Sequence, residues 1–529
     1  MRNGSPETEG EHDRGFFRVE TRDAIKTLSN FLRGSYKEER RIRELAKIFN
    51  PSHITVEDLG DQQVARVTQM MLEATLRILA NDCQTSDCHH DPSMVADKWT
   101  LDYMAEFGHF MLKNLEILLR DGSGVHVMVT VIEVLGGVRV GRHWSRKTMG
   151  FAMRSSIGKE LEKDNIIDQI PDSFSRILRR VTQNLIITRS DRYLRDVILG
   201  RGTSLIQNLL FILRVRSPEV CQTAAKRLVE VIFANPDNRK AITTNSVSAY
   251  LVEAIMLVAD HNRLMYIWKN HLRGHLSEMW RDDIANFVVQ RLIDAAQEIE
   301  LFGEICDEML PKLGTIFACN RPGIGVCLAK AAERFPEMQE LFISALMRAF
   351  NCFEPKERQI ALVSLMLFGD ESPLFHRRRK DPQIIWLHGS LMLQYIFRYK
   401  QPELVSSSLL SLSARRLVNI CNDKSGSHII DCFLLSSTVT ERDKNIFKEK
   451  LRGHYAYVAS DRFGTRVIES LLAHSDLTIR NIILDELANH DFQSSPDTQN
   501  NTRNNPNISV KRRHSSPSNG EKREKRSKN

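Results

Sequence analysis

The sequence predicts an all-α fold in which helical repeats stack into an extended superhelical solenoid. Apolar residues recur at helical spacing through most of the chain, and no stretch shows the sustained alternation of a strand bounded by hairpin turns. Two segments near the end, residues 423–431 and 461–469, align without gaps at an offset of 38 residues. A length of 529 residues with an internal period near 38 is typical of a repeat array.

The composition, 42% hydrophobic and 26% charged, is that of a folded chain and excludes wholesale disorder. Lys and Arg exceed Asp and Glu by 74 − 66 = +8. Residues 511–529 hold eight Lys or Arg and two Glu, so +6 of this charge lies in the tail and +2 in the other 510 residues. Bulk charge therefore says little about what the folded part binds.

Composition along the chain predicts four segments. We expect a disordered N-terminus over residues 1–20, a helical lead-in over 21–60, the solenoid over 61–490 and a disordered basic tail over 491–529, because the tail is too polar to bury a core. The first helix of the array is expected within residues 62–80, where apolar side chains recur at steps of three and four: Val64, Val67, Met71, Ala74 and Ile78.

The sequence gives no sign of a membrane, a metal or an oxidising compartment. The first fifteen residues lack an apolar segment, and the most apolar stretch, residues 125–138, is too short to cross a bilayer. Nine scattered cysteines indicate reduced thiols. One cluster, Cys83 with Cys88, His89 and His90, has ligand chemistry but no second ligand pair, so we interpret it as a polar loop and expect no metal or cofactor.

A small residue begins each copy of the repeat, and we call it the anchor. Eight copies are anchored at Gly124, Gly202, Ser248, Ala285, Gly325, Gly389, Gly426 and Gly464, and a degraded copy is expected before them near Thr85. An apolar pair follows every anchor after three and four residues, and another apolar residue after seven, which predicts one buried helical stripe. Four aspartates stand three residues before their anchors, where they would cap the helix: Asp121, Asp282, Asp423 and Asp461.

The buried stripe leaves the positions one, two and five residues after the anchor open. The first and last lie side by side on one helical face, so two polar groups there can grip a base edge while the middle residue stacks between bases. The triplets are Val125/His126/Val129, Thr203/Ser204/Gln207, Ala249/Tyr250/Glu253, Asn286/Phe287/Gln290, Val326/Cys327/Lys330, Ser390/Leu391/Gln394, Ser427/His428/Asp431 and Thr465/Arg466/Glu469.

These triplets resemble those of the Pumilio-repeat RNA-binding proteins. In that family Asn with Gln around an aromatic residue favours uracil, as in 286/287/290; Ser with Gln favours adenine, as in 390/394; and Ser, Arg and Glu favour guanine, which 465/466/469 matches except for Thr. The valines of the first triplet and Val326 with Lys330 depart from any such code. The spacing of the copies and the runs at 387–394, 426–434 and 460–472 resemble the nucleolar protein 9 family in particular.

The resemblance implies a C-shaped array of about eleven Pumilio-like repeats in the nucleolus. Such proteins bind a small-subunit ribosomal RNA precursor, single-stranded or structured, near the 3′ end of the future mature RNA, and are thought to shield it from premature cleavage. Pre-ribosomal particle proteins are the other expected partners, and we expect a monomer. The expected RNA-binding residues are Thr203, Gln207, Tyr250, Glu253, Asn286, Phe287, Gln290, Ser390, Gln394, Ser427, His428, Asp431, Thr465, Arg466 and Glu469.

Two basic runs lie outside the triplets. Residues 376–380, in a predicted loop at 371–382, either contact phosphate or are merely solvated. The tail resembles a two-part nuclear localisation signal, with a nonspecific RNA-binding tail as the rival interpretation; its residues are Lys511, Arg512, Arg513, Lys522, Arg523, Lys525 and Arg526.

No phosphate-binding loop, zinc-protease motif or nucleophile elbow is present, so we do not expect an enzyme. Two alternatives to the RNA-binding hypothesis stay open at this point. One is a HEAT- or armadillo-like scaffold for protein partners, and the other is a Pumilio-like factor that acts on the large ribosomal subunit.

Overall fold

The computed structural model describes residues 52, 54–85, 98–137, 170–234, 236–369 and 384–489. All regular secondary structure in these ranges is helical, with no strand, which confirms the predicted all-α class. The chain divides into two compact units, residues 1–408 and 409–529. Two of the predicted segments, the N-terminus at 1–20 and the tail at 491–529, lie outside the described residues, as do the loop at 371–382 and the tail signal, so these stay predictions.

Each copy of the repeat is built around one helix that begins at or close to its anchor, and we call these the anchored helices. Nine occur in the described ranges: α4 (Gln62–Thr85), α8 (Gly122–Gly136), α12 (Thr203–Arg216), α15 (Ser248–Val258), α18 (Ala285–Ala295), α21 (Pro322–Arg334), α24 (Leu387–Ile396), α27 (Gly426–Leu435) and α30 (Gly464–Ala473).

A short helix precedes each anchored helix and packs against its start. The short helices are α3 (Val56–Gly60), α7 (Leu115–Leu118), α11 (Asp191–Leu199), α14 (Pro236–Thr243), α17 (Leu276–Arg281), α20 (Leu313–Ala318), α23 (Leu362–Phe368), α26 (Ala414–Cys421) and α29 (Tyr455–Ala459). The 3-10 helix η4 (Lys356–Ala361) leads into α23.

A third helix, the flanking helix, completes each copy. The flanking helices are α6 (Lys98–Lys113), α10 (Asp172–Thr182) with the π-helix η1 (Gln183–Ile187), α13 (Pro218–Ile232), α16 (His261–Ile267) with the π-helix η2 (Trp268–Leu272), α19 (Ile299–Met309) with the 3-10 helix η3 (Leu310–Lys312), α22 (Pro336–Ala349), α25 (Glu403–Leu410), α28 (Glu441–Leu451) and α31 (Leu477–Asn489). Each repeating unit therefore consists of a short helix, an anchored helix and a flanking helix, in that order along the chain.

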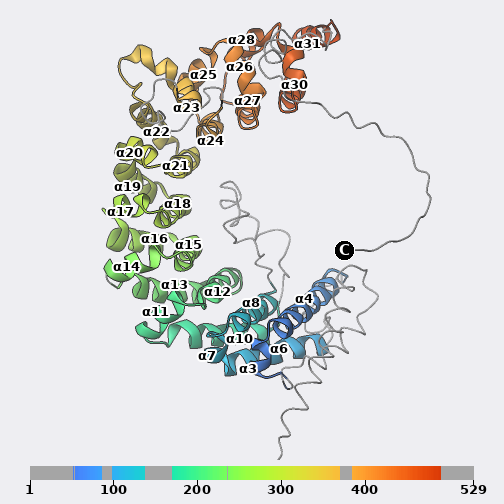
Figure 1. Cartoon of the computed structure of the whole chain (residues 1–529), viewed down its shortest axis with the longest axis vertical. Helices are drawn as coiled ribbons and strands as arrows, with labels where there is room; N and C mark the ends of the chain where they lie inside the picture. Colours follow the sequence, from blue (N-terminus) through green and yellow to red (C-terminus); the bar gives the residue numbers. More distant parts are fainter. Residues whose placement is uncertain are drawn as a thin grey trace, which may run out of the picture. The chain divides into compact units, whose positions relative to one another are not determined.

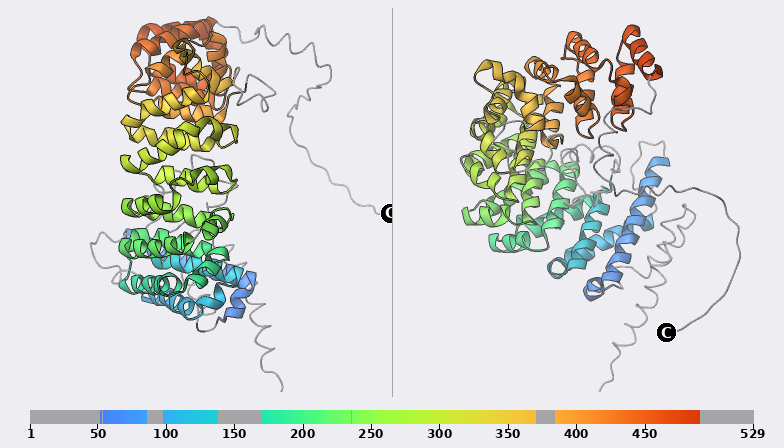
Figure 2. Two further views of the ribbon diagram at one scale, coloured as in Figure 1. Left: turned by 90° about the vertical axis from the view of Figure 1, so that its left-hand side faces the viewer. Right: turned by 45° about the horizontal axis from the view of Figure 1, so that its top comes forward.

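The anchored helices stack side by side. In unit 1 each of them from α4 to α24 contacts the next, and in unit 2 α27 contacts α30. Within unit 1 they lie along the concave side, with the short helices α11, α14 and α17 on the opposite side (Figure 1). The same regular tiers of helices are visible when unit 1 is viewed from that opposite side (Figure 2). This is a solenoid, in which each copy buries its apolar surface on its neighbours.

The anchor is small because the end of the short helix leaves it no room. A Cβ at Gly464 would lie 2.2 Å from the carbonyl oxygen of Val458, and one at Gly124 would lie 3.0 Å from that of Leu118. At the anchor Ser248 the same short distance between the helices allows a hydrogen bond, in which the Ser248 hydroxyl donates to the Ile242 carbonyl at 2.9 Å. In all three copies the carbonyl belongs to the residue six places before the anchor, so this contact sets the angle between the two helices.

All four predicted aspartate caps are confirmed. Each carboxylate accepts a hydrogen bond from the backbone N–H of its anchor at 2.7–3.1 Å, which satisfies a donor that the helix start leaves unpaired. Asn245 caps the Ser248 copy in the same way, with its Oδ1 accepting from the Ser248 N–H at 3.1 Å.

The predicted buried stripe is also confirmed in all eight copies. Every residue three, four and seven places after an anchor is buried, from Val127, Met128 and Val131 in the first copy to Val467, Ile468 and Leu471 in the last.

Polar contacts between neighbouring copies recur at the repeat period. Arg227 pairs with Asp191, the Trp268 indole N–H donates to Glu304 at 2.8 Å, and the Gln222 amide donates to the Val258 carbonyl at 2.7 Å. In each pair the two residues are 36 places apart. Positions about one repeat apart therefore face one another at these junctions.

One predicted position is wrong. The degraded first copy was expected near Thr85, but Thr85 is the last residue of α4, and the copy is centred on α3 and α4. Asp61 marks its true start, because its carboxylate accepts from the Val64 N–H at 3.2 Å as the other caps do. A valine in place of a small anchor hid this copy from the repeat pattern.

Within the ranges that the structure describes, no single helix is long and apolar enough to span a bilayer; α11 and α12 meet the length and composition criteria only as a pair, bent by 104°.

The anchor contact can be tested at Gly389, where an added Cβ would lie 2.6 Å from the backbone oxygen of Met366. Because that backbone cannot move aside, Gly389→Ala should destabilise unit 1 by about 1–3 kcal/mol. Gly303→Ala, in helix α19 with nothing within 4 Å of the new methyl group, is the control and should be neutral or slightly stabilising. Urea denaturation followed by circular dichroism measures both, and equal effects would refute the close-contact explanation.

Candidate nucleic-acid interface

The positions one and five residues after the anchor do lie side by side, as predicted. On α18 the Gln290 amide N–H donates to Asn286 Oδ1 at 2.9 Å, and on α24 the Gln394 amide N–H donates to Ser390 Oγ at 3.0 Å. The glutamine is thus oriented by its partner in both copies. We call these two positions the edge positions, because the resemblance assigns them to base edges, and the residue between them the stacking position.

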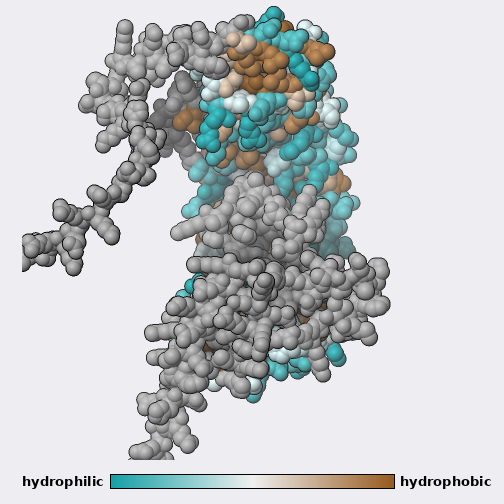
Figure 3. All heavy atoms as spheres, turned by 90° about the vertical axis from the view of Figure 1, so that its right-hand side faces the viewer, coloured by the Kyte–Doolittle hydropathy of each residue, from teal (hydrophilic) through white to brown (hydrophobic). Residues whose placement is uncertain are grey.

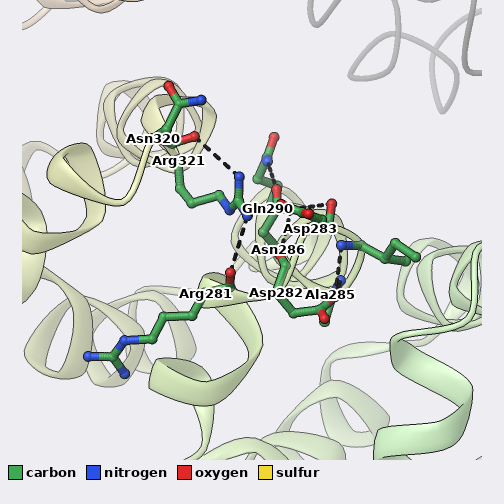
Figure 4. Close-up of polar contacts among 9 residues, drawn as sticks. Arg281, Asp282, Asp283, Ala285, Asn286, Gln290, Asn320 and Arg321 are labelled. Atoms are coloured by element: carbon green, nitrogen blue, oxygen red, sulfur yellow. Dashed lines mark hydrogen bonds and ion pairs between the residues drawn. The ribbon is translucent and has the colours of Figure 1, made fainter. Parts of the chain in front are cut away.

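Asn286 is held by backbone carbonyls at the start of its own helix. Its Nδ2 donates to the carbonyl oxygens of Asp282 at 2.9 Å and Asp283 at 2.8 Å. Arg321, at the start of α21 in the next copy, donates to the Arg281 carbonyl at 3.1 Å and pairs with the Asp283 carboxylate, so it ties the two copies together beside the edge pair (Figure 4). Both amide hydrogens of Asn286 are used by the protein, which leaves Gln290 as the group that can turn toward a base.

The edge positions of unit 1 are much less open than the sequence suggests. Thr203 and Ser390 are fully buried, and Glu253, Asn286, Gln207 and Gln290 are 3–9% exposed. Neighbouring anchored helices pack so closely that these side chains lie between them: a Cβ at Gly323, in the first turn of α21, would be 2.9 Å from Gln290 Oε1. The Thr203 hydroxyl donates to the Ile198 carbonyl at 2.6 Å and is committed to the fold.

The stacking positions are more accessible than the edges. His126, His428 and Arg466 are exposed, and Ser204, Tyr250, Phe287 and Leu391 are half-buried. Cys327 is the exception: it is fully buried with its Sγ 4.0 Å from Gln290 Oε1, and burial raises the pKa of its thiol well above the usual value. It is a neutral packing residue and offers no surface for stacking.

In unit 2 the last copy carries the most open triplet. Thr465, Arg466 and Glu469 are all exposed, because no further anchored helix covers α30 in the described residues. The Thr465 hydroxyl donates to the carbonyls of Ala459 and Asp461 at 2.9 and 2.7 Å, so its oxygen can only accept from a ligand. Glu469 adds further acceptors, and Arg466 adds a planar cation.

The preceding copy in unit 2 pairs a buried Ser427 with a half-buried Asp431. Asp431 lies 3.9 Å from the ring of His428. Burial raises the pKa of the Asp431 carboxyl above its usual value, and the nearby His428 and Arg466 oppose that shift. Two neighbouring groups at the stacking positions, His428 and Arg466, therefore share one electrostatic environment with an edge carboxylate.

A buried ladder of charges crosses three anchored helices in unit 1. Arg291 on α18 pairs with Glu253 on α15 at 3.5 Å and with Asp294 on its own helix at 3.5 Å, and Asp294 pairs with Lys330 on α21 at 3.2 Å. Arg291 is 5% and Glu253 3% exposed. The ladder occupies two predicted edge positions, Glu253 and Lys330, so these side chains hold helices together in the free protein.

Sequence reasoning missed Arg291 and Asp294 because it examined only the three open positions of each copy. A signal was present, since the opposite charges of the ladder stand one repeat apart: Glu253 and Arg291 are separated by 38 residues, and Asp294 and Lys330 by 36. Pairs of opposite charge at the repeat period would have identified the ladder.

Figure 3 shows part of the described surface. On the face shown in Figure 3, hydrophilic side chains cover most of the described residues, with a hydrophobic patch over unit 2. No group of three or more His, Cys, Asp or Glu side chains that could hold a metal occurs within the described ranges. Of the cysteine–histidine cluster, Cys83 belongs to the last turn of α4, and residues 88–90 lie outside those ranges.

The chain matches one family model over most of its length. Residues 64–493 match the NOP9-like PUF repeat domain. This match confirms the resemblance and decides between the two helical-repeat folds considered above, since it selects Pumilio repeats over HEAT or armadillo repeats.

Curated relatives agree with the family model. The chain is 26% identical to nucleolar protein 9 of Mus musculus over 422 residues, covering 75% of this chain and 64% of that protein. It is 27% identical to nucleolar protein 9 of Homo sapiens over 396 residues, covering 69% of this chain and 60% of that protein. The match therefore spans somewhat less than two thirds of these relatives.

A solved structure has the same fold. The structure described as APUM23-GGAUUUGACGG superimposes with a TM-score of 0.67 at 19% sequence identity, covering 84% of this chain and 80% of that one. At this identity the likeness establishes the Pumilio-repeat solenoid.

The ladder predicts an unusually large effect of one buried substitution. Arg291→Met leaves the Glu253 carboxylate buried without its cation and should destabilise unit 1 by about 3–5 kcal/mol. Adding Glu253→Gln removes the stranded charge and should recover part of that loss. Arg398→Met, which breaks a half-exposed pair with Glu333, should cost about 1 kcal/mol or less. Urea denaturation of the variants measures this order, and an Arg291→Met effect as small as that of Arg398→Met would contradict a buried ladder.

Proposed function

The chain belongs to the family of NOP9-like PUF repeat domains, and from this premise we propose that it binds RNA through its anchored helices. We further propose that its RNA is a small-subunit ribosomal RNA precursor in the nucleolus. The nucleolar localisation expected from the resemblance is confirmed by the names of the mouse and human relatives.

One observation carries the RNA proposal: polar edge pairs recur at the same register of several anchored helices, with a third side chain between them. Asn286 with Gln290 and Ser390 with Gln394 are hydrogen-bonded pairs in unit 1, and Thr465 with Glu469 is an open pair in unit 2. Stacked repeats can in this way present one set of base-reading groups per nucleotide. A scaffold for protein partners has no reason to repeat such pairs.

The copies differ in what they can contribute. Arg466 and His428 are exposed and can stack on bases without rearrangement, whereas Gln394 is half-buried and its amide N–H donates to Ser390. The buried Glu253 and Thr203 are occupied by the ladder and by backbone carbonyls, so we assign them to holding the anchored helices. Recognition in the free protein's conformation thus depends on part of the array, and the RNA sequence is specified at some nucleotides only.

Binding of this kind supports a protective role. An RNA strand whose bases are turned toward the anchored helices is withheld from a nuclease that needs an extended, exposed substrate. We propose that the chain shields the precursor near the 3′ end of the mature small-subunit RNA. This proposal is supported by family membership. The alternative hypothesis is that the chain binds a precursor of the large-subunit RNA.

The direct test is binding of the full chain to single-stranded RNA across a salt series. Phosphate contacts release counterions, so the logarithm of affinity should fall linearly with the logarithm of salt, by about 0.7 per contact for a single strand. Undetectable binding at low salt would refute the proposal. Crosslinking in cells, followed by sequencing of the bound RNA, then distinguishes a small-subunit from a large-subunit precursor.

The stacking role of Arg466 gives a second prediction. Arg466→Ala should weaken binding by about 1–3 kcal/mol for all RNA sequences, because stacking on a planar cation tolerates any base. Arg462→Ala is the matched control, because Arg462 is also exposed but lies over the Phe463 ring, before α30 begins and outside the triplet. Equal losses in the two variants, measured by fluorescence anisotropy, would mean that only charge matters.

Asn286 and Gln290 give a base-specific prediction. The double variant Asn286→Ala/Gln290→Ala should weaken binding at one nucleotide position and reduce a uracil preference there by about 1–3 kcal/mol. The control Asn270→Ala/Gln297→Ala removes the same two amide types from exposed positions elsewhere and should leave the preference unchanged. Selection from a random RNA pool measures both, and a uniform loss at every position would show that the pair only supports the fold.

A further inference from the structure

The strongest positive charge in the described part of the chain lies away from the anchored helices. Residues 172–201, from α10 through η1 and α11, contain seven arginines and three aspartates and no lysine or glutamate, a net charge of +4. The whole chain without its tail carries +2, so the rest of that part is slightly acidic. We call this segment the arginine segment.

Most of its arginines are not used by the fold. Arg189 is structural, since it pairs with Glu116 at 2.8 Å and lies over the Tyr193 ring at 4.5 Å, and Asp191 is neutralised by Arg227 from the next copy. The remaining six are exposed, and no hydrogen bond or ion pair within the described ranges engages their side chains: Arg176, Arg179, Arg180, Arg192, Arg195 and Arg201.

Their placement on α10 follows from the helix period. Phe174, Ile177 and Leu178 are buried where α10 packs on α6 and α8. Arg176, Arg179 and Arg180, at 100° per residue, occupy the opposite face and therefore point away from the anchored helix α8. On α11, Leu194 and Ile198 are buried, and Arg192 and Arg195 lie on its exposed side.

Five of these arginines thus belong to the flanking and short helices of two consecutive copies, whereas Arg201 lies in the turn before α12, with its guanidinium beside Gly122 of α8. In Figure 1, α11 lies on the side of unit 1 that faces away from the row of anchored helices. A ligand at the arginine segment would accordingly be separate from bases at the edge positions.

The chemistry of the segment fits a chain of phosphates. A guanidinium presents planar donors that match a phosphate bidentately, and the exclusive use of arginine favours such pairing over a diffuse positive field. A protein partner would be expected to bury an apolar anchor, whereas Leu199 is the one large apolar side chain of the described segment that is markedly exposed. The segment therefore has the charge but not the apolar core of a protein-binding surface.

We propose that the arginine segment is a second RNA-binding surface, which holds the sugar–phosphate backbone of structured RNA flanking the strand read by the anchored helices. This inference rests on the proposed function for the identification of the ligand as RNA, but it assigns a different surface of the protein and a different part of the RNA. The segment supplies affinity and orientation without base specificity.

The test compares two RNAs on the full chain. The first is a single strand of about ten nucleotides, near one nucleotide per repeat, and the second is the same strand continued into a hairpin. The variant Arg176→Gln/Arg179→Gln/Arg180→Gln keeps the exposed side chains polar and removes three charges. The control Arg348→Gln/Lys356→Gln/Arg358→Gln removes the same charge from other exposed positions in unit 1. Thermal melts verify that both fold.

We expect the α10 variant to bind the short strand within about twofold of the wild type and the hairpin RNA about tenfold or more weakly, with a shallower salt dependence by about 0.7–0.9 for each lost phosphate contact. The control should leave both affinities within about twofold. Equal weakening for the two RNAs, or the same loss in the control, would overturn the proposal. It would also be overturned if the α10 variant lost affinity only for polyglutamate and for neither RNA, which would identify an acidic protein as the occupant.

The variant Arg192→Gln/Arg195→Gln on α11 repeats the test if the α10 variant does not fold. Failure of the wild type to bind the short strand contradicts the proposed base reading alone. Hairpin binding that does not depend on these arginines contradicts this inference alone.

Discussion

One close contact sets the geometry of several repeats: at Gly124, Ser248, Gly389 and Gly464 the first turn of the anchored helix lies against a backbone carbonyl of the short helix before it. At Gly464 the nearest carbonyl oxygen would be 2.2 Å from a Cβ, and at Ser248 the same carbonyl accepts the hydroxyl proton. In five copies an aspartate or asparagine three residues before the anchor caps the anchored helix and fixes where it starts. The angle so defined brings each anchored helix against the next.

That packing has a direct effect on function. Close neighbours bury the edge positions of unit 1, so that Glu253 is drawn into an ion-pair ladder and Gln290 lies against Gly323. On α30, where no further anchored helix follows in the described residues, the whole triplet at 465, 466 and 469 is exposed. The same register therefore has two uses: in crowded copies it holds helices together, and in open ones it can meet a ligand.

The fold was predictable because its determinants are local and repeated. Small anchors, the apolar stripe and the aspartate caps all lie within ten residues of each other; the sequence displays the anchor and the stripe eight times and the aspartate cap four times. The candidate site was predictable only as a register. Whether Asn286 or Glu253 is accessible depends on Arg321 and Arg291, residues in or beside neighbouring copies whose contacts arise only when helices stack. The position of the α4 copy was not predicted correctly from the sequence, because Val64 stands where other copies have a small residue.

Charge illustrates the same distinction. The net charge of +8 reports mainly the tail, and the nearly neutral remainder conceals a local excess at residues 172–201. Only the helix faces show that Arg176, Arg179 and Arg180 share an exposed surface opposite the buried face of α10. Sequence totals cannot express such an arrangement, since burial and pairing decide which charges remain available.

The central claim is that the anchored helices contact RNA bases, and photo-crosslinking tests it most directly. A short single-stranded RNA carrying 4-thiouridine would be irradiated with the full chain, and the crosslinked residues identified by mass spectrometry. The account predicts crosslinks at stacking positions such as Phe287, Leu391, His428 and Arg466. Crosslinks confined to the short and flanking helices would contradict it.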